Sequence, residues 1–185
     1  AHFARLPREV LNQIVERIEI GIHHEQQHQE LLLTDIKHNL WQNFPPPPYA
    51  ALQAPGSGAA REMSFIRFEG GLREFGADGQ GFSYDNERPR HRFYFESFEL
   101  ADRLVTNQEY LEFMSDGGYR DYRHWLSDGW DALHLQGWHA PLYWENRDGE
   151  WWHYTLRGMK PLDPHEPVAH VSFYEAAAFS KWRNC

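Results

Sequence analysis

Two histidines four positions apart, His24 and His28, are the residues of this sequence best placed to do chemistry. If the surrounding stretch is helical, their side chains lie one above the other, with Cβ atoms about 5–6 Å apart. Two imidazoles in this arrangement can chelate one metal ion. The alternative is a solvated polar face, but Gly21 leaves space on the same face and Leu31 continues it with an apolar side chain. The pattern therefore favours a metal site.

The identity of the metal is open at this point. Residues His24 to His28 match the H-E-x-x-H motif of zinc peptidases, in which Glu25 would be the general base. The extended form of that motif needs glycine at position 31 and histidine at position 34, where this chain has Leu31 and Thr34. Two histidines with open coordination positions are also typical of non-heme iron sites.

No third ligand is evident on the same helix. Glu30 points well away from the histidine face, and Asp35 shares that face but lies about 10 Å further along the helix from His28. The third ligand must therefore come from another part of the fold.

The element that has to position the histidines is one long helix, from about Pro7 to about Asn43. Proline suits a first helical turn, and only Gly21 interrupts the run. Apolar residues at helical spacing form a stripe roughly opposite the histidine face, typical of a bundle helix: Leu11, Val15, Ile18, Ile22, Leu33, Ile36 and Leu40. One helix cannot bury such a stripe alone, so we expect partner helices outside this chain, as in an excerpt of a longer protein.

The remaining sequence lacks the long helical pattern of residues 7–43. Residues 44–62 form a Pro/Gly-rich linker containing four consecutive prolines. Residues 63–185 contain short strands, glycine turns and two helices with serine or threonine caps. The expected elements are a strand at Ser64–Glu69, a half-buried strand at His91–Leu100, a helix from Asn107 to about Asp116 capped by Thr106, a turn at Asp128–Gly129, a hairpin joining Leu142–Glu145 to Trp151–Thr155, and a helix at Phe173–Arg183 capped by Ser172. The fold class is α+β.

Composition excludes several functions. The formal charge of −9 argues against nucleic acid as a partner. No stretch is long and apolar enough to span a membrane, and the N-terminus does not look like a signal peptide. The single cysteine, Cys185, excludes an internal disulfide and fits a reducing cytoplasm, and at the last position it is a poor nucleophile candidate.

Other polar residues are expected to be structural. The segment Asp85-Asn86-Glu87 could bind a cation, but a polar turn before a strand explains it more simply. Seven further histidines lack paired helical spacing: His91, His124, His134, His139, His153, His165 and His170.

Several segments together resemble a known family. The stretches Asp102–Tyr119 and Pro167–Trp182 resemble the formylglycine-generating-enzyme/sulfatase-modifying domain, a variant C-type-lectin-like fold that is poor in regular structure. Gly81–His91, Ala140–Trp144 and the helix His23–His38 are similar to the ergothioneine-type sulfoxide synthases, the EgtB family. The resemblance implies three parts: residues 1–43 as the last long helix of a DinB-like four-helix bundle, 44–62 as linker, and 63–185 as the N-terminal portion of the lectin-like domain.

The resemblance also implies a function. Members use non-heme Fe(II) and O₂ to form a carbon–sulfur bond between hercynine and cysteine or γ-glutamylcysteine. Of their three iron-binding histidines, two match His24 and His28, and Gln27 matches a position that hydrogen-bonds the substrate imidazole. The third lies upstream on another helix, and His2 is too close to this helix to replace it. The family's catalytic tyrosine lies beyond Cys185, so no catalytic residue is assigned here.

Two further interpretations stay open. An ovothiol- or selenoneine-type synthase would use the same kind of site with a different substrate. A catalytically silent binding module would keep the fold as a scaffold.

Overall fold

The computed structural model describes residues 6–51, 53, 56 and 58–184 of the 185-residue chain. His2 and Cys185, discussed above, lie outside the described residues. The chain divides into two compact units, which we describe separately. The first unit comprises residues 1–36 and 65–100, and the second comprises residues 37–64 and 101–185.

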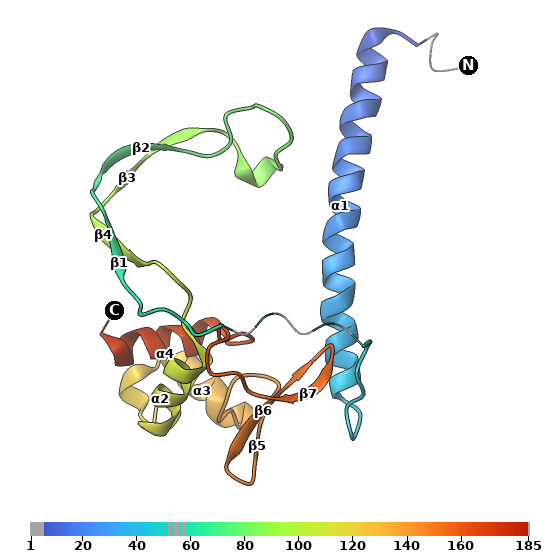
Figure 1. The fold of residues 1–185 in the computed structure, drawn as a ribbon. Coiled ribbons are helices and arrows are strands. Elements are labelled where there is room, and N and C mark those ends of the chain that lie inside the picture. Colours follow the sequence, from blue (N-terminus) through green and yellow to red (C-terminus); the bar gives the residue numbers. More distant parts are fainter. Residues whose placement is uncertain (1–5, 52, 54–55, 57, 185) are drawn as a thin grey trace. The chain divides into compact units, whose positions relative to one another are not determined.

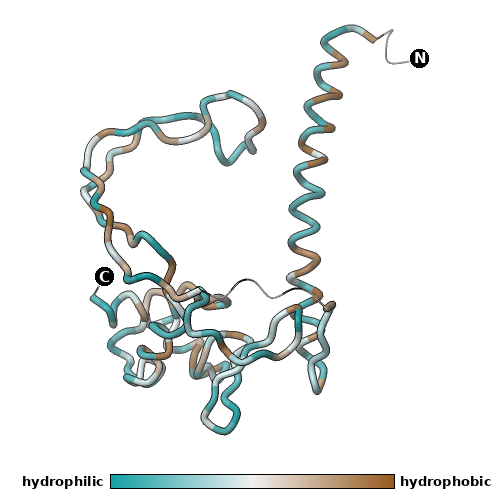
Figure 2. The backbone as a smooth tube through the Cα atoms, viewed as in Figure 1, coloured by the Kyte–Doolittle hydropathy of each residue, from teal (hydrophilic) through white to brown (hydrophobic). Residues whose placement is uncertain are grey.

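The long helix α1 runs from Arg8 to Trp41, so its predicted existence and extent are confirmed (Figure 1). Its first backbone hydrogen bond runs from the Leu11 amide to the Pro7 carbonyl, as expected for a proline at a helix start. No residue of α1 is buried, and apolar positions such as Val15 and Ile18 are exposed. Figure 2 shows hydrophobic positions recurring between hydrophilic ones along this helix. Most of the apolar stripe is therefore exposed within the part of the chain that the structure describes, and only Leu11, Ile36 and Leu40 are partly buried.

The rest of the first unit consists of paired strands. β2 (Gly71–Phe75) and β3 (His91–Phe95) are antiparallel, with Leu72 opposite Tyr94. β1 (Phe65–Phe68) pairs with β4 (Phe98–Ala101). A short 3₁₀ turn, η2 (Asp85–Glu87), lies between β2 and β3.

The predicted single strand at His91–Leu100 is wrong in two respects. It is divided into β3 and β4, because the chain changes its pairing partner from β2 to β1 between them. Its side chains are mostly exposed rather than half-buried. Gly70 lies at this change of partner, where a Cβ would approach the Phe95 carbonyl oxygen to 2.8 Å, so only glycine allows the two backbones to come so close.

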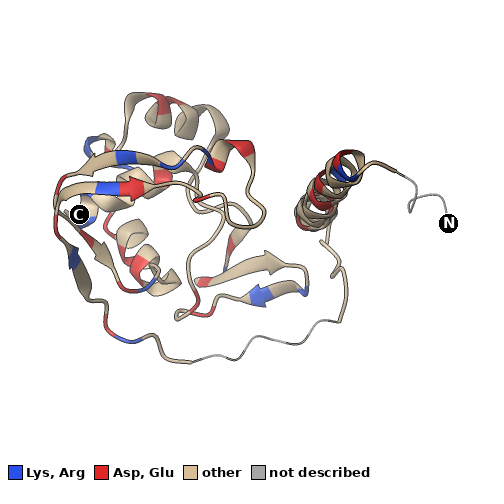
Figure 3. Cartoon of the chain, turned by 90° about the horizontal axis from the view of Figure 1, so that it is seen from above, with Lys and Arg blue, Asp and Glu red and all other residues tan. Residues whose placement is uncertain are grey.

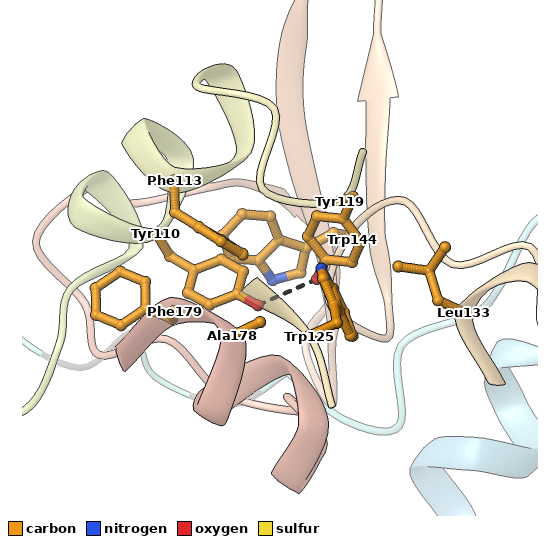
Figure 4. Close-up of a cluster of buried hydrophobic side chains, with 8 residues drawn as sticks. All are labelled: Tyr110, Phe113, Tyr119, Trp125, Leu133, Trp144, Ala178 and Phe179. Atoms are coloured by element: carbon orange, nitrogen blue, oxygen red, sulfur yellow. Dashed lines mark hydrogen bonds between the residues drawn. The ribbon is translucent and has the colours of Figure 1, made fainter. Parts of the chain in front are cut away.

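The second unit holds the hydrophobic core. It contains α2 (Asn107–Ser115), η3 (Tyr122–His124), α3 (Ser127–Gln136), a three-stranded antiparallel sheet of β5 (Trp144–Arg147), β6 (Glu150–Thr155) and β7 (Gly158–Pro161), and α4 (Phe173–Arg183). Its buried cluster, shown in Figure 4, consists of Tyr110, Phe113, Tyr119, Trp125, Leu133, Trp144, Ala178 and Phe179.

The predicted caps and hairpin of the second unit are confirmed. The Thr106 hydroxyl accepts the Glu109 amide at the start of α2, and the Ser172 hydroxyl accepts the Glu175 amide at the start of α4. The hairpin between β5 and β6 turns at Asp148–Gly149, with Trp144 opposite His153.

The predicted turn at Asp128–Gly129 is wrong, because both residues lie inside α3. Gly129 is buried against Tyr174, and a Cβ there would lie 2.7 Å from that side chain. The glycine therefore serves close packing rather than a turn.

Acidic and basic residues are interspersed along the elements in Figure 3. Among the described helices, none combines the length and apolar character needed to cross a membrane.

Candidate functional site

The two histidines singled out by their spacing do lie side by side. The ring centroids of His24 and His28 are 4.4 Å apart, with an interplanar angle of 83°. Both side chains are exposed on an uninterrupted stretch of α1, so the helix alone brings them together. Metal binding by the pair remains a prediction.

The donor set of this pair fits a metal that takes its other ligands from elsewhere. Two adjacent imidazoles can direct ring nitrogens to a common point, and the exposed face leaves room for further ligands. Within the described residues, no group of three or more histidine, cysteine or acidic side chains is placed to hold a metal ion. The third ligand is therefore still expected from outside this part of the chain.

Gln27 precedes His28 by one residue and is exposed. One residue rotates a helical side chain by about 100°, so Gln27 borders the histidine face without lying on it. Glu25, the candidate general base of the peptidase alternative, is also exposed and follows His24 with the same rotation. Neither side chain has a hydrogen-bond partner among the described residues, so the Gln27 amide is free to meet a ligand.

The segment Gly81–His91 contributes a contact with α1 that residue spacing does not predict. The Phe82 ring stacks on His23, with centroids 3.9 Å apart, and packs edge-on against Tyr84. The Tyr84 hydroxyl is buried and has no hydrogen-bond partner in the described part of the chain. The loop that carries Phe82 and Tyr84 therefore contacts α1 at His23, the residue before His24. The only sequence signal for it was the family resemblance of the loop.

The acidic residues of this loop are used internally. The Glu87 carboxylate accepts the Tyr84 amide at 2.7 Å, and Asp85 accepts the amide of Asn86. The Arg88 guanidinium donates to the carbonyl oxygen of Ser83. These bonds agree with the polar-turn interpretation of Asp85-Asn86-Glu87.

A second polar cluster lies at the C-terminal end of α1, within the second unit. Lys37 Nζ donates to His170 Nε2 at 2.6 Å and lies 4.5 Å from the centroid of the Tyr143 ring. Burial lowers the pKa of Lys37 to about 8. Burial and the neighbouring Lys37 charge lower the pKa of His170 to about 4. His170 is therefore a neutral acceptor at physiological pH.

Further side chains complete this cluster. His38 Nδ1 is 3.1 Å from the Tyr143 hydroxyl. Trp41 packs edge-on against Tyr143, with ring centroids 5.7 Å apart. A cavity of about 130 Å³ adjoins the cluster and is also lined by His153 and Glu166. Burial lowers the pKa of His153. The sequence predicts only a structural role for His153 and His170.

Comparison with known proteins supports the resemblance. Residues 52–185 match the model of the Sulfatase-modifying factor enzyme 1-like domain, named FGE-sulfatase. The "Hercynine oxygenase" of Mycolicibacterium smegmatis is 34% identical over 168 residues, which are 90% of this chain and 38% of that protein. The protein of the same name from Mycobacterium tuberculosis is 37% identical over 100 residues, 54% of this chain and 23% of that protein.

A more distant relative points to the same family. The "Formylglycine-generating enzyme" of Streptomyces coelicolor is 26% identical over 150 residues, 75% of this chain and 48% of that protein. The chain thus spans less than half the length of each of these curated relatives. Because the domain model covers well over half of the sequence, the chain belongs to the family of Sulfatase-modifying factor enzyme 1-like domains.

Proposed function

We propose that the protein containing this chain is a non-heme Fe(II), O₂-dependent sulfoxide synthase of ergothioneine biosynthesis. It would join hercynine to cysteine or γ-glutamylcysteine through a new carbon–sulfur bond. The observation that carries the proposal is the adjacent His24/His28 ring pair, in a chain 33–37% identical to proteins named hercynine oxygenase. A metal-binding pair on a helix is what an oxygenase site requires from this part of the chain.

Each residue has a distinct role in this proposal. His24 and His28 would hold the iron through ring nitrogens, with a third ligand from outside the described residues. Bound there, Fe(II) supplies the redox chemistry with O₂ that forming a carbon–sulfur bond requires. The Gln27 amide donates a hydrogen bond to a ring nitrogen of hercynine and orients the imidazole. The stack of Phe82 on His23 holds the Gly81–His91 loop against α1 next to the histidine pair.

The peptidase alternative assigns the same helix differently. It needs Glu25 close to a metal-bound water, together with a ligand that the extended peptidase motif places where this chain has Thr34. The relatives reported above carry oxygenase and formylglycine-generating names, and none of them carries a peptidase name. The oxygenase proposal therefore has the better support.

The test is product formation by the full-length protein. The iron-loaded protein is incubated with O₂, hercynine and either cysteine or γ-glutamylcysteine. The products are separated by chromatography and identified by mass spectrometry. We expect the sulfoxide of the hercynine–thiol adduct, and none under anaerobic conditions. An adduct formed only with histidine in place of hercynine, or only with a selenium donor, would identify an ovothiol- or selenoneine-type synthase instead. No adduct with any pair would refute the proposal in favour of a silent binding module.

A further inference from the structure

A small polar cavity lies within the second unit, beside the last two turns of α1. Its volume is about 130 Å³, and its polar lining includes Lys37, Asn107, His153, Glu166 and His170. Every residue of the lining, Lys37 among them, belongs to the second unit. One water molecule needs roughly 10–15 Å³ of such space, so the cavity has room for a small polyatomic ion.

The ammonium group of Lys37 has no anionic partner among the described residues. It carries three N–H donors, and one of them is directed to His170 Nε2 at 2.6 Å. The group also lies 4.5 Å from the centroid of the Tyr143 ring, which attracts a cation but carries no charge. A buried charge is normally paired with an opposite charge. Burial without such a partner lowers the pKa of Lys37 to about 8, so most of the charge is still present at pH 7.

Two imidazoles line the cavity together with Lys37. Burial lowers the pKa of His170 to about 4 and also lowers the pKa of His153, and the Lys37 charge adds to both effects. Each neutral ring keeps one N–H donor. The one carboxylate among the lining residues, that of Glu166, lies 4.0 Å from His153 Nε2. The cavity therefore combines an unpaired ammonium group with neutral N–H donors, a set that suits a small anion.

Two residues of the lining also have an uncommon backbone conformation. Tyr143 has φ of +74° and His170 has φ of +62°, both in the left-handed region. The other described non-glycine residues of this kind, Asp148 and Asn184, lie in an Asp-Gly hairpin turn and at the C-cap of α4, where such values are ordinary.

Tyr143 and His170 have no such local explanation. Their ring centroids are 4.8 Å apart, and both rings contact the Lys37 ammonium group. Backbone strain of this kind persists only where the surroundings require it, and it is concentrated at sites that hold ligands. Here the strained backbone gathers an imidazole and an aromatic ring around one charge at the wall of the cavity.

We propose that this cavity binds a small oxyanion, either a short carboxylate or an inorganic oxyanion, through the Lys37 ammonium group. The anion supplies the opposite charge that the described residues do not give to Lys37. Its remaining oxygens can accept the N–H groups of His153 and His170. Neither His24 nor His28 takes part, so this binding is separate from the reaction proposed above.

The test is a calorimetric titration of the full-length protein at pH 7, with sodium acetate and sodium sulfate as separate probes. Ionic strength is held constant, because surface charges are screened by salt. Lys37→Met removes the ammonium group and keeps an unbranched side chain. Lys160→Met is the matched control: Lys160 is exposed on β7, lies opposite His153 and does not line the cavity.

We expect the wild type to bind one anion per chain at this cavity. Lys37→Met should weaken binding by about tenfold or more, the scale of a lost charge-assisted hydrogen bond, and Lys160→Met should stay within about twofold of the wild type. Binding of acetate alone would identify a carboxylate ligand, and binding of sulfate alone would identify an inorganic oxyanion.

Two results would overturn the proposal. One is a wild type that binds neither probe. The other is equal affinity in the wild type and Lys37→Met, which includes an anion held by a metal on His24 and His28, because Lys37→Met retains both histidines.

The pH dependence of the wild type covers the case in which Lys37→Met does not fold. With a pKa of about 8, the protonated fraction of Lys37 falls about tenfold between pH 7 and pH 9, and the affinity should fall by the same factor. The charges of acetate and sulfate are constant over this range. The other titratable groups of the lining also keep their charge state: His153, His170, Tyr143, Tyr154 and Glu166. Arg157 and Asp163, which act on His153 from outside the lining, do so as well. Equal affinity at pH 7 and pH 9 would show that the anion does not bind Lys37.

Discussion

At the scale of single residues, Glu25 separates the oxygenase and peptidase alternatives. In the oxygenase proposal its side chain is rotated by about 100° from His24 and has no chemical role. Glu25→Gln should therefore keep sulfoxide formation within a few-fold of the wild type. A loss on the order of a hundredfold, the scale of a missing acid–base group, would restore the hydrolase alternative. The measurement is the initial rate of product formation at saturating substrates.

The contacts of the histidines differ in how far the sequence predicts them. The adjacency of His24 and His28 needs only a helix, so it follows from the sequence alone. The stack of Phe82 on His23 joins residues from separate elements, and the Lys37–His170 bond joins residues 133 positions apart. No periodicity links such positions, so only the folded chain reveals them.

Gln27 is predicted to act on the substrate and not on the metal. Losing one neutral hydrogen bond costs roughly 0.5–1.5 kcal/mol, and more if a buried polar group is stranded. Gln27→Leu should therefore weaken hercynine binding several-fold to tens-fold in calorimetric titrations of the iron-loaded full-length protein, with iron content unchanged. Unchanged affinity would remove Gln27 from the site. Lost iron would instead indicate that it supports the ligands.

At the scale of elements, helices with caps were predicted well and the exposed strands less well. Thr106 and Ser172 mark their helices because a short hydroxyl side chain can accept a free amide of the first turn. By contrast, α3 has Leu126 at its N-cap, without a side-chain cap, and contains Gly129, a residue type that locally favours a turn. Gly129 is helical because it packs closely against Tyr174. Such a tertiary contact overrides local propensity and cannot be predicted from the local sequence.

The Thr106 cap provides a test at this scale. Its hydroxyl accepts the Glu109 amide, and the Glu109 carboxylate accepts the Thr106 amide at 2.9 Å. Thr106→Ala should lower the free energy of unfolding by about 1 kcal/mol, because α2 loses a partner for one first-turn amide. Thr106→Ser keeps the hydroxyl and serves as the control. Equal urea midpoints for the alanine and serine variants would show that the cap does not contribute to stability.

At the scale of the whole molecule, the sequence predicts a change after the linker, from one long helix to short strands, turns and capped helices. It also predicted an apolar stripe on α1, and the described residues leave most of this stripe exposed. The DinB-like bundle and the boundaries 1–43, 44–62 and 63–185 remain predictions. A stripe indicates that partner helices exist but does not identify them.

The low pKa of His170 predicts how the stability of the protein depends on pH. The unfolded chain binds a proton at this histidine with an ordinary pKa of about 6.5, whereas the folded chain does so only near pH 4. The unfolded state therefore takes up more protons as the pH falls from about 6.5 to about 4, and stability declines over that window. His153, whose pKa is also lowered, contributes in the same direction.

His170→Asn isolates this contribution. Between pH 6.5 and 4, the melting temperature of the variant should fall by less than that of the wild type. If the melting temperatures of wild type and variant fall equally between pH 6.5 and 4, the assignment to His170 is wrong.

Glu109 affects a different pH window. Arg103 holds the pKa of the Glu109 carboxyl at about 2, so the contribution of Glu109 to stability is lost only as the pH falls from about 4.5 toward 2.

The most direct test of the account is the iron content of the full-length protein carrying His24→Ala. Alanine is the best helix former, so α1 should persist while one ligand is lost. We predict that wild type and a His134→Ala control carry stoichiometric iron after anaerobic loading, and that His24→Ala carries almost none at unchanged helicity. Stoichiometric iron in His24→Ala would show that the metal is held elsewhere.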